Sequence, residues 1–257
     1  MALRGNEADA AGFTLVRLIS GAAALIIISY FFAAKSAKTG RGNWVSAFFL
    51  FAYAVCFSFA YLSLTAATGA LILFSSVQLT MIATALFKGE RPRALELVGL
   101  AVALGGLVYL VFPGLSSPPL ASSLLMAAAG ASWGVYTLRG RGSSDPLSDT
   151  TGNFIRSVPF VVLVAILFLP NIHLSARGIL LAVLSGALAS GVGYTVWYAA
   201  LKHLTATRAA VLQLAVPVIA AAGGIVFLAE AASSSLAIAA ALILGGIGLT
   251  IFGCRRS

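Results

Sequence analysis

The sequence predicts an all-α polytopic membrane protein built from two helical repeats of inverted topology. Three observations predict this fold class: the composition is strongly apolar, the apolar residues form nine long runs, and the two halves share motifs in the same order. Of the 257 residues, 60% are hydrophobic and only 9% are charged, whereas a soluble domain carries about 25% charged residues. So few charges cannot cover a water-facing surface. The composition therefore excludes a soluble enzyme, a nucleic-acid binder and a disordered protein.

Each of the nine runs is long enough to cross a bilayer as a helix. A hydrocarbon core about 30 Å thick needs roughly 20 apolar residues, each rising about 1.5 Å. We expect transmembrane helices over residues 13–33, 44–64, 68–87, 94–112, 120–138, 151–169, 178–200, 208–228 and 234–253. The first run continues into further spans, so it does not have the form of a cleaved signal peptide.

The basic residues indicate the orientation of the chain, because short cytoplasmic loops retain Lys and Arg. If the loop after the first run lies inside, the basic residues that fall inside are Lys35, Lys38, Arg41, Lys88, Arg91, Arg93, Arg139, Arg141, Lys202, Arg208, Arg255 and Arg256. Only Arg4 and Arg177 fall outside. We therefore expect a multi-pass protein of the bacterial inner membrane with a cytoplasmic C-terminus. Cys56 and Cys254 are expected to form no disulfide.

Motifs recur between the two halves at a nearly constant offset, which indicates an internal repeat. The paired residues are Arg17 and Arg156, Tyr61 and Tyr198, Glu90 and Glu230, and Gly105–Gly106 and Gly245–Gly246. Glu90 and Glu230 fall on opposite predicted sides of the membrane, so the copies are inverted. We assign residues 1–114 to a first repeat of four helices and 115–257 to a second repeat of five. The first repeat then lacks its first helix, either because the start codon is assigned too late, which we favour, or because the chain is truncated.

This pattern resembles the EamA-type permeases of the drug/metabolite transporter superfamily. The residues that carry the resemblance are Gly89-Glu90 followed by Gly99, Gly105 and Gly106, Glu230 followed by Gly245 and Gly246, the early arginines Arg17 and Arg156, Pro217, and the pair Trp133 and Tyr136. Val77 stands where the family often has a proline, and Ala229 stands where it usually has a glycine. The resemblance implies a ten-helix transporter of small organic solutes, commonly exported amino acids, metabolites or drugs.

Polar and aromatic residues within the spans are the candidates for a solute pathway. They are Tyr53, Gln78, Trp133, Tyr136, Tyr194, Trp197, Gln213 and Pro217. The aromatic residues form either an interfacial belt or a cage for an apolar or cationic solute. Gln78 either lines the pathway or bonds neighbouring helices together. Pro217 frees the carbonyl of Gln213, which either meets the solute or is satisfied by a neighbouring helix.

Arg17 and Arg156 are candidate gate charges at opposite mouths of the pathway. The alternative is that both snorkel to the headgroups, because Arg17 lies about four residues from one end of its run and Arg156 about five from one end of its own.

The sequence gives no catalytic motif, metal-ligand set or cofactor-binding loop. We therefore expect no enzyme activity, no catalytic residue, no metal and no cofactor. The partners that we expect are a small-molecule solute and the lipid bilayer, with no nucleic acid and with a second copy of the chain as a candidate homodimer. The expected function is secondary transport of a small organic solute, in the export direction, by alternating access of the two repeats. The alternative is a non-transporting or inactive membrane partner protein.

Overall fold

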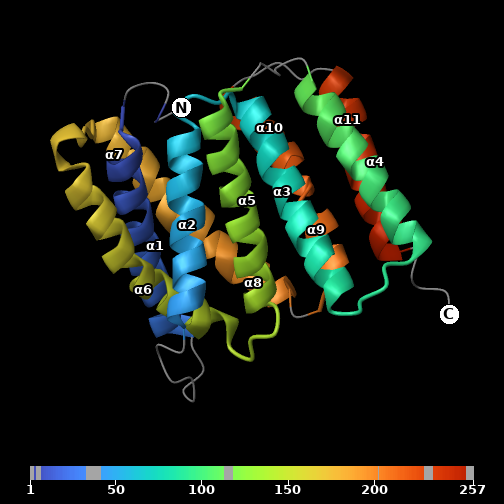
Figure 1. The fold of residues 1–257 in the computed structure, drawn as a ribbon, viewed down its shortest axis with the longest axis horizontal. Coiled ribbons are helices and arrows are strands. Elements are labelled where there is room, and N and C mark those ends of the chain that lie inside the picture. The colour runs from blue at the N-terminus through green and yellow to red at the C-terminus, as the bar shows by residue number, and fades with distance from the viewer. Residues whose placement is uncertain are drawn as a thin grey trace. The chain divides into compact units, whose positions relative to one another are not determined.

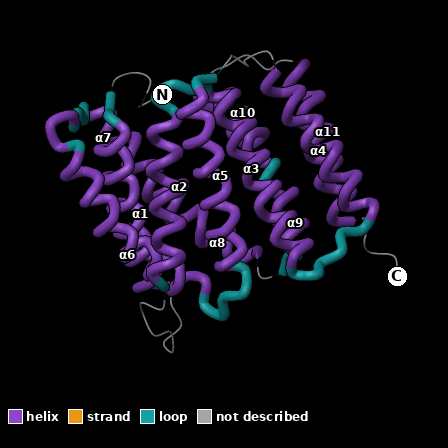
Figure 2. The backbone as a smooth tube through the Cα atoms, in the orientation of Figure 1, coloured by secondary structure: helices purple, strands orange, loops and turns teal. Residues whose placement is uncertain are grey.

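The computed structural model describes residues 3, 7–32, 42–112, 118–201, 203–228 and 234–252. In this described part the regular elements are helices, and the one additional feature is an isolated bridge between Ala8 and Leu174 (Figures 1 and 2). The predicted all-α fold class is therefore confirmed. Several residues named above lie outside the described part: Arg4, Lys35, Lys38, Arg41, Lys202, Ala229, Glu230, Cys254, Arg255 and Arg256.

The helices follow the predicted runs closely. Their bounds are α1 Ala10–Phe32, α2 Trp44–Ala60, α3 Ala66–Phe87, α4 Ala94–Val111, α5 Leu120–Gly140, α6 Pro146–Leu167, α7 Ala176–Leu184, α8 Gly193–Leu201, α9 Ala206–Leu212, α10 Ala215–Leu228 and α11 Ser234–Phe252. Two predicted spans are not uniform α-helices. The run 178–200 contains a π-helix, Ser185–Val192, between α7 and α8, and the run 208–228 is interrupted between α9 and α10.

Seven stretches of the described chain are long and apolar enough to cross a membrane. They correspond to α1, α3, α4, α6, the continuous segment α7 to α8, the start of the α9–α10 segment, and α11. Two of the nine predicted spans, α2 and α5, are not among these seven stretches. Helix α2 is apolar but has only 17 residues, and α5 includes Arg139 and several serines. The protein is thus a multi-pass membrane protein.

Side chains at the helix starts supply the hydrogen bonds that the first turns lack. Asn43 begins α2 and accepts from Ser46 N, while Thr65, Ser175 and Thr205 do the same for α3, α7 and α9. The first backbone N–H groups of a helix have no partner within it, so such caps fix where a helix begins.

The helices form two compact units, each assembled from two separate parts of the chain. Unit 1 comprises Met1–Leu64 and Pro119–His203, and unit 2 comprises Thr65–Pro118 and Leu204–Ser257. Each unit therefore draws helices from both halves of the sequence. The division into repeats at residue 114 is a different partition, and it stays a prediction.

Within unit 1, α1 packs against α6 and the π-helix, and α2 packs against α5. Hydroxyl groups join these helices across their interfaces. Thr14 donates to Ser58 at 2.7 Å between α1 and α2, and Ser29 lies 2.8 Å from Thr151 between α1 and α6. Interhelical hydrogen bonds of this kind stabilise helix association in lipid, where helices gain little from the hydrophobic effect.

Within unit 2, α4 and α11 lie side by side (Figure 1), and glycines lie where the two helices approach each other. A Cβ atom on Gly246 would lie 2.5 Å from the carbonyl oxygen of Gly99 and 2.7 Å from the backbone nitrogen of Ala103. A Cβ atom on Gly106 would lie 2.8 Å from Cβ of Leu242. Both approaches require glycine, as in small-residue helix interfaces of other membrane proteins.

We predict that Gly106→Ala and Gly246→Ala lower the melting temperature of the detergent-solubilised protein. The added methyl group overlaps the facing helix, and overpacking typically costs about 1–3 kcal/mol. Gly105→Ala and Gly245→Ala are matched controls, because nothing lies within 4 Å of a Cβ atom at either position. These controls keep or raise the melting temperature, since alanine favours a helix over glycine. Equal losses at all four positions would contradict the assigned packing.

Candidate functional site

Five aromatic residues of unit 1 form a continuous group, which we call the aromatic cluster: Tyr53 of α2, Trp133 and Tyr136 of α5, and Tyr194 and Tyr198 of α8. The ring of Trp133 lies 5.1 Å from that of Tyr53 and 4.8 Å from that of Tyr194. The rings of Tyr136 and Tyr198 meet edge to face at 5.6 Å. These separations are typical of favourable aromatic pairs. The structure thus joins residues that the sequence places on three separate helices.

Three of the five residues of the aromatic cluster are buried, and Tyr53 and Trp133 are half-buried. Tyr136 is 1% exposed, Tyr194 8% and Tyr198 2%, so these three do not form a belt that faces the membrane interface. Trp197 lies on α8 three residues after Tyr194 and is half-buried. Its indole nitrogen is buried without a hydrogen-bond partner in the described chain.

Arg17 of α1 borders the cluster. Its Nε donates to Oγ of Ser190 at 3.4 Å, and its Nη2 donates to the hydroxyl of Tyr53 at 3.4 Å. The guanidinium carbon lies 5.5 Å from the ring centre of Tyr53 and 5.6 Å from that of Phe57, which is within reach of a cation–π interaction. The guanidinium of Arg17 therefore contacts the aromatic cluster through Tyr53.

The snorkelling interpretation of Arg17 does not fit the structure. Helix α1 begins at Ala10 rather than at residue 13, so Arg17 lies about 10 Å along the helix axis from its start. The residue is only 7% exposed. An arginine placed at the centre of a membrane helix costs about 2.5–3.5 kcal/mol on insertion scales, so a charge this deep needs the contacts that surround it.

The π-helix between α7 and α8 places Ser190 opposite Arg17. Ser190 is 1% exposed, and its hydroxyl donates at 3.1 Å to the carbonyl of Ser185, five residues earlier. Its oxygen remains able to accept from Arg17. A π-helix widens a turn and shifts the following side chains around the axis, and such segments are frequent at functional sites. Sequence reasoning missed Ser190, because nothing in the residue types indicates a π-helix.

Arg156, the predicted symmetry mate of Arg17, has a different environment. It is half-buried near the middle of α6, and its Nη1 donates to the carbonyl of Gly152 at 3.1 Å. Its role as a gate charge stays a prediction.

Gln78 and Gln213 belong to unit 2, on α3 and at the end of α9. Gln78 is 3% exposed, and its Nε2 donates to the carbonyl of Ala210 at 2.6 Å. Its Oε1 is buried without a hydrogen-bond partner in the described chain, which is a costly arrangement for an amide. Gln213 is 4% exposed and donates to Sδ of Met81 at 3.1 Å. Gln78 thus bonds two helices and also keeps one acceptor open.

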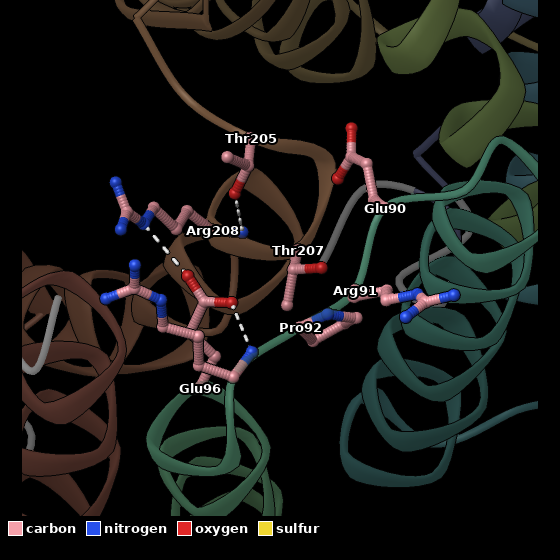
Figure 3. A pocket seen from close by; sticks show the side chains of 8 residues that line it. Glu90, Arg91, Pro92, Glu96, Thr205, Thr207 and Arg208 are labelled. Atoms are coloured by element: carbon pink, nitrogen blue, oxygen red, sulfur yellow. Dashed lines mark hydrogen bonds and ion pairs between the residues drawn. The ribbon is translucent and has the colours of Figure 1, made fainter.

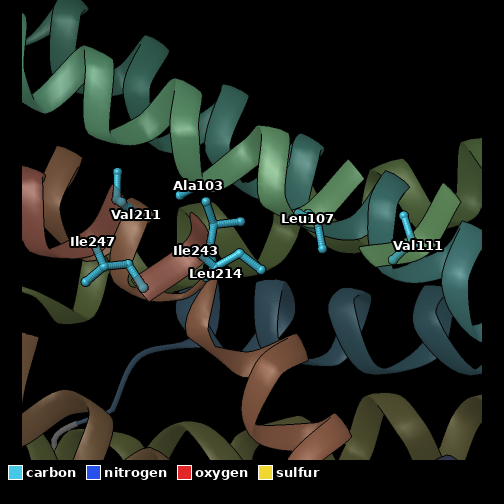
Figure 4. Close-up of a cluster of buried hydrophobic side chains, with 7 residues drawn as sticks. All are labelled: Ala103, Leu107, Val111, Val211, Leu214, Ile243 and Ile247. Atoms are coloured by element: carbon cyan, nitrogen blue, oxygen red, sulfur yellow. The ribbon is translucent and has the colours of Figure 1, made fainter. Parts of the chain in front are cut away.

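The interruption between α9 and α10 falls at Gln213 and Leu214, just before Pro217. The carbonyl of Gln213, which we expected to be free, accepts from Val216 N at 3.0 Å. The chain tightens into a shorter turn there, so the acceptor is satisfied locally. A buried apolar cluster around Leu214 holds the turn against α4 and α11 (Figure 4). Pro217 therefore acts through the shape of the backbone and not through an open carbonyl.

A polar cavity of about 230 Å³ lies at one end of unit 2 (Figure 3). Its centre is an ion pair in which Arg208 Nε donates to Oε1 of Glu96 at 3.1 Å. The other oxygen of Glu96 accepts from Arg93 N at 3.0 Å, which caps α4. No local sequence pattern relates Glu96 to Arg208, because the two residues are 112 positions apart in the chain. In the described residues no three His, Cys, Asp or Glu side chains group in a way that could hold a metal.

We predict that Glu96→Gln and Arg208→Gln each destabilise the protein. The side chains of Glu96 and Arg208 are only 10% and 23% exposed, and a hydrogen bond to a charged group contributes about 1.5–3 kcal/mol. The double variant should lose less than the sum of the single losses, because neither charge is then left alone. The measurement is the melting temperature in detergent. Additive losses would show that the pair makes no coupled contribution.

The chain is similar in sequence or structure to several known proteins. A protein of Pseudomonas aeruginosa described as uncharacterized is 46% identical over 250 residues, which cover 97% of this chain and 87% of that one. The aromatic amino acid exporter YddG of Ancylobacter novellus is 27% identical over 184 residues, covering 69% of this chain and 64% of the exporter. A solved crystal structure superposes with a TM-score of 0.82 at 24% identity, covering 100% of this chain and 92% of the other, and this shows a shared fold.

A family model describes the second half of the chain. The model of the EamA-like transporter family matches residues 120–252, which run from the start of α5 to the end of α11. The apolar helices and the matched family agree with each other. The chain therefore belongs to the EamA-like transporter family.

Proposed function

We propose that the protein is a secondary transporter that exports a small organic solute, such as an amino acid, a metabolite or a drug, across the bacterial inner membrane. The observation that carries this proposal is the aromatic cluster with Arg17: a buried charge and buried tyrosines inside the helices of a transporter-family protein. A relative named as an aromatic amino acid exporter supports the export direction and an aromatic solute. The distribution of Lys and Arg supports a cytoplasmic C-terminus.

Alternating access of two inverted repeats is the mechanism that we propose. The motif pairs between the halves support it, because an inverted repeat supplies two related conformations around one site. The turn at Gln213 and Leu214 is an irregular point within unit 2, and the π-helix is another irregular point within unit 1. Hinge residues of transporters lie at such irregular positions.

Export should be measurable in two steps. Cells that overproduce the protein are screened for resistance to toxic analogues of amino acids and metabolites, and we expect resistance to at least one aromatic analogue. The purified protein is then reconstituted into vesicles and flux of the matching labelled solute is measured, with protein-free vesicles as the control. A folded protein that confers no resistance and moves none of the solutes would instead support the non-transporting partner.

Gln78 is predicted to be needed for transport but not for membrane insertion. Gln78→Ala, and Gln78→Met, which keeps the volume, remove the amide and should lower flux by about tenfold or more if a hydrogen bond to the solute is lost. Leu79→Ala is the matched control, because Leu79 is the next residue on α3 and is 73% exposed. Protein amount in the membrane is measured in parallel. Unchanged flux in Gln78→Met would remove Gln78 from the pathway.

A further inference from the structure

The charge of Arg17 is not neutralised by any carboxylate of the described chain. Each described carboxylate has its own partners: Glu7 contacts Ser175 and Arg177, Asp9 contacts Gly12 and His173, Glu90 contacts Ala206, Glu96 contacts Arg93 and Arg208, Asp145 contacts Ser148, and Asp149 contacts Ser143. Arg17 donates to the neutral hydroxyls of Ser190 and Tyr53, both at 3.4 Å, and the neutral hydroxyl of Tyr194 lies beside the same guanidinium. A buried cation usually has an anionic partner, because burial without one is unfavourable.

We propose that Arg17, together with Ser190 and Tyr53, binds the carboxylate of a solute whose apolar or aromatic body lies against the aromatic cluster. The proposal rests on the proposed transport function and names the class of its solute. A guanidinium has five N–H donors in a planar fork that matches a carboxylate. Its donors engage the hydroxyls of Ser190 and Tyr53 at 3.4 Å, which is a long distance for a hydrogen bond, so the fork is held in place by neutral groups.

The site is built by the fold and is not a chance cluster of polar groups. Arg17, Ser190 and Tyr53 come from α1, the π-helix and α2, and the first two are 7% and 1% exposed. Ser190 is fixed by its bond to the carbonyl of Ser185. Gly186 lies directly against the α1 backbone at Arg17, where a Cβ atom would overlap the carbonyl of Arg17. The π-helix and α1 therefore approach each other closely at the charge.

Aromatic rings surround the charge. Tyr53 contacts Arg17 and Trp133, and Trp133 contacts Tyr194, with neighbouring ring centres 5.1 and 4.8 Å apart. The hydroxyl of Tyr194 in turn lies beside the guanidinium of Arg17. A solute that carries both a carboxylate and an aromatic ring matches this set of groups. The cage for a cationic solute, one of the sequence-based alternatives, does not fit, because Arg17 itself occupies the faces of Tyr53 and Phe57.

This arrangement recognises the carboxylate and not an amino group. The described chain places no carboxylate against Arg17, so an ammonium group of the solute would meet only a like charge and neutral hydroxyls there. We therefore expect an aromatic carboxylate without an amino group, such as 3-phenylpropionate, to bind at least as well as phenylalanine. Phenethylamine and 3-phenylpropanamide, which lack the carboxylate, should bind poorly.

The test is binding of these four compounds to the purified full chain in detergent, measured by calorimetry and by quenching of tryptophan fluorescence. In the wild-type protein, 3-phenylpropionate should bind about 10- to 100-fold more tightly than its amide, as expected for a charged hydrogen-bonded contact. This comparison needs no variant. Equal binding of the amide, or tighter binding of the amine, would overturn the proposal.

Variants then test whether Arg17 causes the preference for a carboxylate over an amide. Arg17→Gln should remove the preference for carboxylate over amide, and Arg17→Lys should keep part of it, because the ammonium retains the charge but not the planar fork. Arg177→Gln is the control for loss of a positive charge, since the Arg177 side chain is 73% exposed. Melting temperatures without ligand report folding. A folded Arg17→Gln protein that still prefers the carboxylate would refute the assignment.

The binding and flux measurements test the proposed site and the proposed transport function independently. Carboxylate-selective binding without flux in vesicles would support the site and contradict the proposed transport function. Flux of another solute without carboxylate-selective binding would support transport and contradict the site.

Discussion

The hydrocarbon of a bilayer offers no hydrogen-bond partners, and this constraint shapes each level of the structure. Backbone groups that face lipid must be paired within the chain, so the described spans are helices. Side chains follow the same rule. Hydroxyls such as those of Thr80 and Thr84 donate to carbonyls four residues earlier on their own helix, and others, such as Thr14, also reach a neighbouring helix. A polar group is kept where the protein can satisfy it.

The same constraint explains how the helices hold together. Lipid tails are as apolar as leucine side chains, so burying leucine gives little reason for helices to associate. Close packing replaces that driving force in unit 2, where the backbones of α4 and α11 approach at Gly99, Gly106 and Gly246. In unit 1, pairs of hydroxyl groups connect α1 to its neighbouring helices. Leucines such as Leu79 face outward at little cost because the surroundings are apolar.

Hydropathy predicted the helices to within a few residues, because span length depends only on bilayer thickness. It could not predict which helix faces meet. The spans are apolar on most sides, so their patterns do not identify the buried face of α3 or place Gln78 beside Ala210. The three-residue error at the start of α1 made Arg17 look like an interfacial residue. The π-helix that brings Ser190 to Arg17, and the pairing of Glu96 with Arg208, depend on tertiary contacts between distant segments. Sequence therefore identified most residues of the aromatic cluster without showing that they form one group.

Two arginines of this protein differ in the partners that surround their charge. Arg208 meets Glu96 at 3.1 Å, and Glu96 is fixed in turn by the start of α4. That charge is neutralised within unit 2 and needs nothing further. Arg17 is buried as deeply as Glu96, but its side-chain contacts within the described part of the chain are hydroxyls and aromatic faces. Neutral contacts of this kind orient a guanidinium without neutralising it, which is the electrostatic condition under which an incoming anion gains most.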